Sequence, residues 1–244
     1  LLILDAPDGV GVALENVSYA FNEQSPVVLD SVSFRITAGK TVVIVGATGS
    51  GKSTLLAVMA GLLQPSQGRV ALAGKTASIV FQEPFLFSGS IEYNICLGQQ
   101  LSKEMIAEAL YLSASDSFVS ELANGTKTMI GERGISLSGG QRQRISLARA
   151  IAQGADVLLL DDTTSALDTV TEAVVVERLR GASRKVTTVV VASRPSTIAL
   201  ADDVLFIEGG KLTDHGPHSA LMLSNENYRN LMQSFEHDRN EGDV

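Results

Sequence analysis

One segment restricts the possible folds of this chain more than any other: a glycine-rich turn between an apolar run and a helical pattern. Residues 46–53 read Gly-Ala-Thr-Gly-Ser-Gly-Lys-Ser, which fits the pattern G-x-x-x-x-G-K-[ST]. The β-branched run Thr41–Val45 before the turn predicts a buried strand, and the residues from Lys52 to about Leu63 predict a helix. A strand, a glycine turn and a helix in this order predict a loop whose backbone N–H groups converge on phosphate oxygens.

The residue types in this turn suit phosphate and metal binding. Lys52 is long enough to reach β- and γ-phosphate oxygens, and the Ser53 hydroxyl is a suitable Mg²⁺ ligand. The alternative is a glycine turn that merely happens to precede a lysine, but that alternative would not require a strand before it and a helix after it. The candidate phosphate-binding residues are Gly46, Ala47, Thr48, Gly49, Ser50, Gly51, Lys52, Ser53 and Thr54.

A second candidate site lies where another apolar run ends in a carboxylate. Residues 158–161 read Leu-Leu-Leu-Asp, which is typical of a buried strand that ends at a polar site. Many buried strands end in aspartate, so this pattern is weak by itself. Combined with a phosphate-binding loop, it predicts that Asp161 holds Mg²⁺, directly or through water.

Composition and charge argue against several other kinds of protein. The 244 residues carry a formal net charge of -8 and no Lys/Arg-rich run, which argues against nucleic-acid binding. The single cysteine, Cys96, excludes an internal disulfide framework. No segment of the sequence reaches the roughly 18 apolar residues of a membrane span. Because the chain also starts at Leu1 without a signal-peptide pattern, we expect a fragment that lacks its transmembrane domain.

The rest of the sequence alternates strand patterns with helical ones, which predicts a mostly parallel sheet covered on both faces. Residues from Ser90 to about Ala152 interrupt this alternation with mostly helical spacing, so we expect them to form a separate lobe. Other strands are expected within residues 11–19, 28–36, 70–81, 157–160, 187–191 and 204–207. Residues 217–235 are expected to be helical, and the polar residues 237–244 are expected to fray.

The most specific string in the chain is Leu-Ser-Gly-Gly-Gln at residues 137–141, followed by Arg-Gln-Arg-Ile-Ser-Leu-Ala-Arg-Ala. With this signature string the chain resembles the ATP-binding cassette (ABC) family over almost its whole length. The resemblance implies an α/β fold: a P-loop NTPase (RecA-like) core with a mixed or parallel sheet, an N-terminal antiparallel β subdomain and an inserted α-helical subdomain. It implies a core at about 1–88 and 153–235, a helical subdomain at about 89–152, and ATP and Mg²⁺ as cofactors.

Other motifs of the family follow in the expected order. Gln82 resembles the Q-loop glutamine, which senses Mg²⁺ and the membrane domains. Residues 165–168, Ser-Ala-Leu-Asp, resemble the D-loop and end in Asp168. The metal ligands that the resemblance implies are Ser53, Gln82 and Asp161.

An aromatic pair falls where the family carries its adenine-stacking ring. Residues 19–21 read Tyr-Ala-Phe. From the register of the strand we assign the stacking role to Phe21 and a core position to Tyr19. Phenylalanine lacks the phenol usual at this position, but stacking requires only the face of a ring.

Two further segments resemble the exporters within the family. Residues 86–91 with Asn94 and Ile95 resemble the exporter stretch that follows the Q-loop. Gly-Glu-Arg-Gly at residues 131–134 resembles the X-loop, which in exporters contacts the coupling helices of the transmembrane domains. The resemblance therefore implies a domain at the cytoplasmic face of a membrane, with transmembrane domains as partners.

The family also implies a partner for the signature. Two cassettes pack head to tail, and each ATP lies between the phosphate loop of one cassette and the signature of the other. A glycine turn that caps a helix would explain part of the string, but it would not explain Gln141 or the length of the match. The residues that would complete a partner's site, with the D-loop aspartate, are Ser138, Gly139, Gly140, Gln141 and Asp168.

The sequence departs from the family at two catalytic positions. Most active cassettes have glutamate after the strand-end aspartate, where this chain has Asp162. Aspartate is one methylene shorter, and a misplacement of about 1 Å can lower a rate on the order of a hundredfold. The family's switch histidine is replaced by Ser193, which is shorter and carries no positive charge. With Gln82 as the third candidate catalytic residue, we expect this site to bind ATP and Mg²⁺ but to hydrolyse ATP slowly or not at all.

An intact signature beside an altered site implies an asymmetric pair, in which the second cassette is a different chain that keeps the glutamate and the histidine. Two other interpretations remain open at this point. The chain could be a fully competent ATPase subunit of a homodimeric exporter that tolerates Asp162 and Ser193. It could also be a soluble ABC-type protein gated by nucleotide, although the spacing between phosphate loop and signature leaves no heptad array for the coiled-coil insertions of many such proteins.

Overall fold

Strand β4 (Thr41–Val45) lies at the centre of the fold, and all five of its residues are buried. Val42 and Ile44 belong to one hydrophobic cluster, whereas Val43 and Val45 belong to another on the opposite face. This alternation follows from the period of two in a strand, and it requires cover on both faces of the sheet. The computed structural model describes residues 3–22, 24–131, 137–163, 167–182 and 186–242, with side chains described as far as residue 237.

The main sheet has six strands in the order β12-β11-β4-β10-β9-β6. Neighbouring strands are parallel except for β11 and β12, which pair antiparallel. Because the strands on either side of β4 run parallel to it, their carboxyl ends meet at one edge. The strands are β6 (Ala77–Val80), β9 (Val157–Asp161), β10 (Thr187–Val191), β11 (Asp203–Glu208) and β12 (Lys211–Gly216).

A second sheet is formed by the N-terminal part of the chain. It has four strands in the order β1-β5-β2-β3. Strand β2 pairs antiparallel with both β3 and β5, as the N-terminal antiparallel β subdomain requires. Helix α1 (Lys52–Met59) shares a hydrophobic cluster with this sheet and with one face of the main sheet. The strands are β1 (Leu4–Asp5), β2 (Val10–Tyr19), β3 (Leu29–Thr37) and β5 (Gln67–Leu72), and a short 3₁₀ turn (Ala73–Lys75) follows β5.

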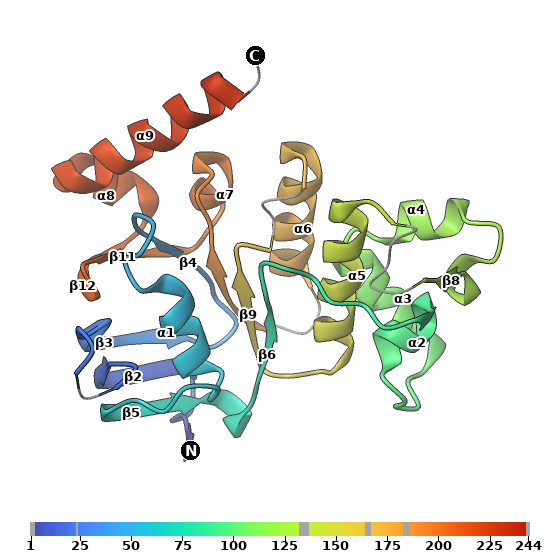
Figure 1. Cartoon of the computed structure of the whole chain (residues 1–244), viewed down its shortest axis with the longest axis horizontal. Helices are drawn as coiled ribbons and strands as arrows, with labels where there is room; N and C mark the ends of the chain where they lie inside the picture. The colour runs from blue at the N-terminus through green and yellow to red at the C-terminus, as the bar shows by residue number, and fades with distance from the viewer. Residues whose placement is uncertain (1–2, 23, 132–136, 164–166, 183–185, 243–244) are drawn as a thin grey trace.

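A helical lobe projects from the main sheet, on the right in Figure 1. Its helices pack around a hydrophobic cluster of their own, which includes Ile95, Leu110 and Ile145. Helix α5 also packs Leu147 and Ala150 against the main sheet, so this helix joins the lobe to the core. We propose residues 89–152 as the inserted subdomain. Its elements are β7 (Gly89–Ser90), α2 (Ile91–Cys96), α3 (Lys103–Leu112), α4 (Asp116–Glu121), a 3₁₀ turn (Gly125–Lys127), β8 (Met129–Ile130) and α5 (Gly139–Ala152).

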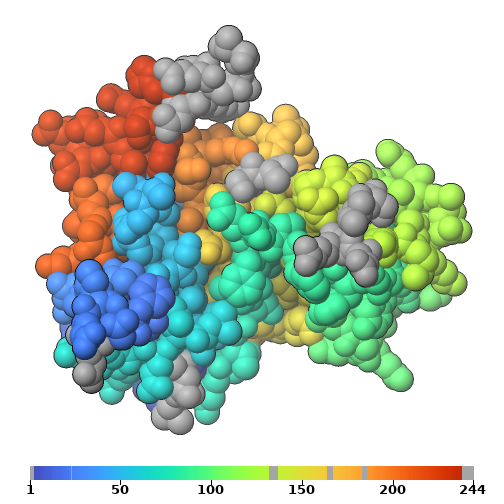
Figure 2. Space-filling model, in the orientation of Figure 1, coloured from blue at the N-terminus to red at the C-terminus, as the bar shows by residue number. Residues whose placement is uncertain are grey.

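The second face of the main sheet is covered by helices from the last third of the chain. They share one cluster with Val43, Leu158 and Phe206 of the sheet. Figure 2 shows the last two helices on the side of the molecule away from the helical lobe. These helices are α6 (Thr169–Gly181), α7 (Pro195–Ala199), α8 (His218–Ser224) and α9 (Glu226–Gly242).

Two sequence predictions differ from the structure at the ends of helices, and one strand was missed. Helix α1 ends at Met59 rather than near Leu63, because Gly61 adopts φ +73° and terminates the helix before the proline. Strand β12 was not predicted, since its residues are largely polar and it lies at the edge of the sheet. The tail expected to fray after residue 237 instead continues α9 to Gly242.

Candidate functional site

The glycine-rich turn connects the carboxyl end of β4 to the first residue of α1. Gly49 and Gly51 have φ of +80° and +101°, a region that side chains with a Cβ avoid. A Cβ on Gly46 would lie 2.3 Å from the carbonyl oxygen of Ile207, so the backbone there permits only glycine. These constraints hold the turn against β11 and place the start of α1, with its unpaired N–H groups, at the sheet edge.

Lys52 lies within the turn itself. Its Nζ donates hydrogen bonds to the carbonyl oxygens of Gly46 (2.7 Å) and Ala47 (2.9 Å). Burial lowers the pKa of Lys52, and the nearby carboxylates of Asp162 and Asp161 oppose that shift. The ammonium group is therefore held at the turn, where an anion would meet both it and the helix start.

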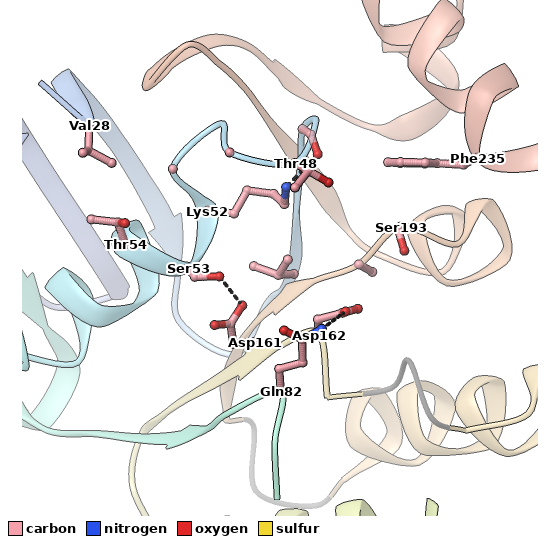
Figure 3. Close-up of a pocket in the computed structure, with 15 residues that line it drawn as sticks. Val28, Thr48, Lys52, Ser53, Thr54, Gln82, Asp161, Asp162, Ser193 and Phe235 are labelled. Atoms are coloured by element: carbon pink, nitrogen blue, oxygen red, sulfur yellow. Dashed lines mark hydrogen bonds between the residues drawn. The ribbon is translucent and has the colours of Figure 1, made fainter. Parts of the chain in front are cut away.

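Ser53 and Asp161 form the oxygen-rich part of the site. The Ser53 hydroxyl donates a hydrogen bond of 2.9 Å to Oδ1 of Asp161 across the gap between α1 and the end of β9 (Figure 3). Burial raises the pKa of Asp161, whereas the Ser53 hydrogen bond and the Lys52 charge lower it. Hydroxyl and carboxylate oxygens are the ligands that Mg²⁺ prefers, so this pair fits a magnesium ion.

Asp162 follows directly and is held by Gln82, whose Nε2 donates a 3.1 Å hydrogen bond to Oδ2 of Asp162. Burial and then the charge of Asp161 raise the pKa of Asp162, while Arg194 is the first of the groups that lower it. Asp162 has φ +46°, the left-handed region that few residues with a side chain occupy. Strain of this kind is common at functional sites.

A cavity of about 440 Å³ brings these groups together. Figure 3 shows Lys52, Ser53, Asp161, Asp162 and Gln82 around it, with Ser193 on the far side from Ser53. The cavity lies at the shared carboxyl edge of β4, β6, β9 and β10, the usual ligand site of such a sheet. Its lining residues are Val28, Gly46, Thr48, Gly49, Gly51, Lys52, Ser53, Thr54, Gln82, Asp161, Asp162, Val191, Ala192, Ser193 and Phe235.

Four lining residues were not among the candidate site residues: Val28, Val191, Ala192 and Phe235. Val28 precedes β3 and reaches the cavity from the β subdomain. Phe235 belongs to α9 and reaches the cavity from the C-terminal helices. Phe235 also packs against the hydrophobic cluster on the second face of the sheet. An apolar residue in a helical tail gives no sequence signal that separates a cavity position from a core position.

The switch segment carries a charged pair next to Ser193. Pro195 occupies the first turn of α7, where its missing N–H is tolerated. Arg194 forms an ion pair with Glu172 of α6, and the Glu172 side chain is only 1% exposed. The pair joins the switch segment to the helix that follows the D-loop.

Several predicted site residues lie outside the cavity. Ser138 caps α5, and its hydroxyl accepts a hydrogen bond from the Gln141 N–H while Gln141 Oε1 accepts one from the Ser138 N–H. Asp168 caps α6 in a similar way by accepting hydrogen bonds from Thr171. Gly139 and Gly140 form the first turn of α5, also away from the cavity lining. The X-loop residues 132–134 and the D-loop residues 165–166 lie outside the described residues.

The aromatic pair near the N-terminus consists of one buried ring and one exposed ring. Tyr19 is buried in the hydrophobic cluster of the β subdomain, which confirms its core position. Phe21 is 64% exposed, and its ring stacks edge-on against Tyr19 with the centroids 5.2 Å apart. Phe21 does not line the cavity, so its ring is presented to solvent.

A family model described as "ABC transporter" matches residues 29–165, more than half of the chain. The chain belongs to the ABC transporter family. This confirms the resemblance seen in the signature and the phosphate loop. No helix in the described part of this ABC domain combines the length and apolar character that a membrane span needs.

Several proteins are similar to this ABC domain. Mycobactin import ATP-binding/permease protein IrtB of Mycolicibacterium smegmatis is 41% identical over 233 residues, 90% of this chain and 40% of that protein. ABC transporter B family member 13 of Arabidopsis thaliana is 38% identical over 238 residues, 92% of this chain and 19% of that protein. This ABC domain thus spans less than half the length of these relatives.

A solved structure supports the fold. The structure of a bacterial Atm1-family ABC exporter with ATP bound matches with a TM-score of 0.85 at 31% identity, covering 95% of this chain and 44% of that one. The predicted α/β fold with a P-loop core is therefore confirmed.

Proposed function

We propose that this ABC domain is the ATP-binding motor of an ABC exporter, which couples ATP binding and hydrolysis to transport of a substrate across a membrane. The observation that carries the proposal is a cavity lined together by the glycine turn, Lys52, Ser53 and Asp161. The exporter assignment is supported by the similarity to the Atm1-family exporter and by the segment at residues 86–91. The chain would lie at the cytoplasmic face of the membrane, below its transmembrane domains.

ATP would bind with its phosphates in the glycine turn. The backbone N–H groups of residues 46–54 and the Lys52 ammonium group would contact phosphate oxygens, and Phe21 would stack on the adenine ring. The exposed ring of Phe21 is free for that contact. Ser53 and Asp161, with Gln82, would hold Mg²⁺, which neutralises charge on the phosphates. The hydrogen bond between Ser53 and Asp161 supports this assignment because it brings two suitable oxygens within 2.9 Å.

The domain's own site would hydrolyse ATP slowly or not at all. Asp162 has the shorter side chain, and Gln82 holds one of its carboxylate oxygens. A general base must lie within hydrogen-bond reach of the water that it activates, and a shorter and tethered carboxylate loses that reach. Ser193 lines the cavity but offers only a hydroxyl in place of an imidazole. ATP retained here would hold two cassettes together while the other site turns over.

The signature would complete the site of a second ABC domain in a head-to-tail dimer, and that partner would be a different chain. Ser138, Gly139, Gly140 and Gln141 begin a helix of 14 residues, so their N–H groups and the serine hydroxyl suit a partner's γ-phosphate. The signature does not line this chain's own cavity, which is consistent with a role toward another chain. Asp168 would act at the same interface.

ATPase measurements on the chain test this proposal. We expect the unchanged chain to hydrolyse ATP slowly by itself, and Asp162→Glu with Ser193→His to raise the rate about a hundredfold. Lys52→Met in the repaired chain serves as the control and should abolish the gain. An ordinary cassette rate in the unchanged chain, lost on Asp162→Ala, would instead support a fully competent homodimeric ATPase.

A further inference from the structure

Phe235 reaches the nucleotide cavity from a part of the fold that none of the sequence motifs involves. It lies on α9, while the other lining residues come from the β subdomain, from the glycine turn with the start of α1, and from the carboxyl edge of the main sheet. In Figure 3 its ring points toward Thr48 of the glycine turn, and Ser193 lies next to it. The ring therefore borders the cavity between the turn and the switch segment.

Phe235 is held in position because its helix packs against the core of the domain. Phe235 packs against the hydrophobic cluster that also contains Tyr228 and Met232 of the same helix. Tyr228 is fully buried, and its ring meets Phe206 of β11 with the centroids 5.4 Å apart. Helix α9 is thus anchored on the sheet one to two turns before Phe235, which holds the ring at the cavity.

The wall of the cavity beside Phe235 carries little side-chain bulk, because Ser193 stands where the family resemblance implies a histidine. Ser193 lines this wall with a two-atom side chain, and its neighbours Val191 and Ala192 offer no polar side-chain atoms. Such a wall would admit water to the terminal phosphate of a bound nucleotide. A phenylalanine ring fills space without offering a base or an acid, so it excludes water and adds no hydrolytic group.

We propose that, in a chain without its partner, Phe235 covers the phosphate end of the cavity over bound ATP and slows its release. This inference rests on the proposed function, since it deepens the account of a site that retains ATP. An aromatic ring carries partial positive charge at its edge, so its edge is compatible with phosphate oxygens. Excluding water also lowers the local dielectric constant, which strengthens the contacts of Lys52 with the phosphates.

Nucleotide dissociation from the 244-residue chain tests the inference. The chain is loaded with a ribose-labelled fluorescent ATP and Mg²⁺, and release is followed after excess unlabelled ATP is added. We expect Phe235→Ala to raise the dissociation rate about tenfold, equivalent to about 1.4 kcal/mol. Phe235→Leu keeps part of the bulk and should give an intermediate rate.

The control variant is Gln233→Ala, which removes an exposed side chain of α9 two residues before Phe235. Gln233 belongs neither to the hydrophobic cluster nor to the cavity lining. If the ring itself closes the cavity, Gln233→Ala leaves the dissociation rate within about twofold of the unchanged chain. Equal rates for Phe235→Ala and the unchanged chain would overturn the inference, as would equal acceleration by Gln233→Ala. If the unchanged chain binds no ATP, the proposed function is wrong, and this inference is wrong with it.

A tryptophan reporter gives a second readout that does not depend on the label. The chain contains no tryptophan, so Phe235→Trp introduces a single indole at the cavity. We expect ATP with Mg²⁺ to change the emission of this variant. Leu223→Trp provides the control, because Leu223 is 84% exposed on α8 and should not respond. A silent Phe235→Trp variant that still binds ATP would contradict contact between position 235 and the nucleotide.

Discussion

The amide of Gln82 and the carboxylate of Asp162 are joined by a hydrogen bond of 3.1 Å, which links the segment after β6 to the end of β9. The roles proposed for these two positions are to sense Mg²⁺ and to activate water. In this chain they contact one another in the same cavity as Lys52. The bond holds one oxygen of the Asp162 carboxylate, in a residue whose φ is +46°.

The carboxylate of Asp162 is expected to lower the stability of the folded chain. Its raised pKa means that the folded state disfavours the charged form, so at neutral pH the charge costs stability. Asp162→Asn removes that charge, keeps an oxygen that Gln82 can donate to, and tolerates positive φ. We expect the midpoint of thermal unfolding to rise by about 2–4 °C at pH 7.

Asp168→Asn is the matched control for this prediction. Hydrogen bonds from Thr171 lower the pKa of Asp168, so its charge stabilises the folded state. Scanning calorimetry should therefore show no rise in the midpoint for Asp168→Asn. A lower midpoint for Asp162→Asn than for the unchanged chain would contradict the view that the charge is unfavourable.

The stability that the packing of α9 contributes to the fold is expected to depend on pH. The ring nitrogen Nδ1 of His218 lies 2.7 Å from the hydroxyl of Tyr228, and burial lowers the pKa of His218 below its usual 6.5. The unfolded chain therefore binds a proton at this histidine more readily than the folded chain does. This contribution to stability is complete above pH 6.5 and is lost as the pH falls through the lowered pKa.

Urea unfolding at a series of pH values checks this prediction. His218→Gln keeps a hydrogen-bonding partner for Tyr228 but cannot titrate, so it should lose less stability between pH 7 and pH 5 than the unchanged chain. His215→Gln controls for removal of a histidine on the neighbouring strand β12. Identical pH dependence in the unchanged chain and His218→Gln would refute the role of His218.

The ion pair between Arg194 and Glu172 is expected to hold the switch segment in place. Because the Glu172 side chain is 1% exposed, Arg194→Met would leave a buried charge without this partner. We expect that variant to lose about 3 kcal/mol of unfolding free energy. Combining it with Glu172→Leu should restore most of the loss, since an apolar pair of similar size can replace a buried ion pair. Additive losses in denaturant unfolding would show that the two side chains do not act together.

Much of the fold could be predicted because the strongest patterns are local. The β-branched run Thr41–Val45 favours a strand buried on both faces, and the glycine turn after it requires backbone angles that few other residues adopt. The edge strand β12 could not be predicted, because a polar strand gains its stability from pairing with β11 and not from its own pattern.

The site residues could be predicted where a residue type suited to binding phosphate or Mg²⁺ stands at a fixed position in a sequence motif. The strand-end Asp161 and the loop serine Ser53 are far apart in sequence, yet parallel strands bring them within one hydrogen bond. The contribution of Phe235 depends on how α9 packs across the sheet, which no local pattern specifies. Ser138 and Asp168 cap helices within this chain, and their proposed roles would be exerted on a second cassette.

The central claim is that ATP binds in the glycine turn that ends at Lys52 and Ser53. Titration calorimetry of the 244-residue chain with ATP and Mg²⁺ tests it most directly, with Lys52→Met and Ser138→Ala compared with the unchanged chain. We predict that Lys52→Met weakens binding at least about tenfold, equivalent to about 1.4 kcal/mol, while Ser138→Ala binds as the unchanged chain does. Equal affinity of the unchanged chain and Lys52→Met, or no binding by the unchanged chain, would contradict the claim.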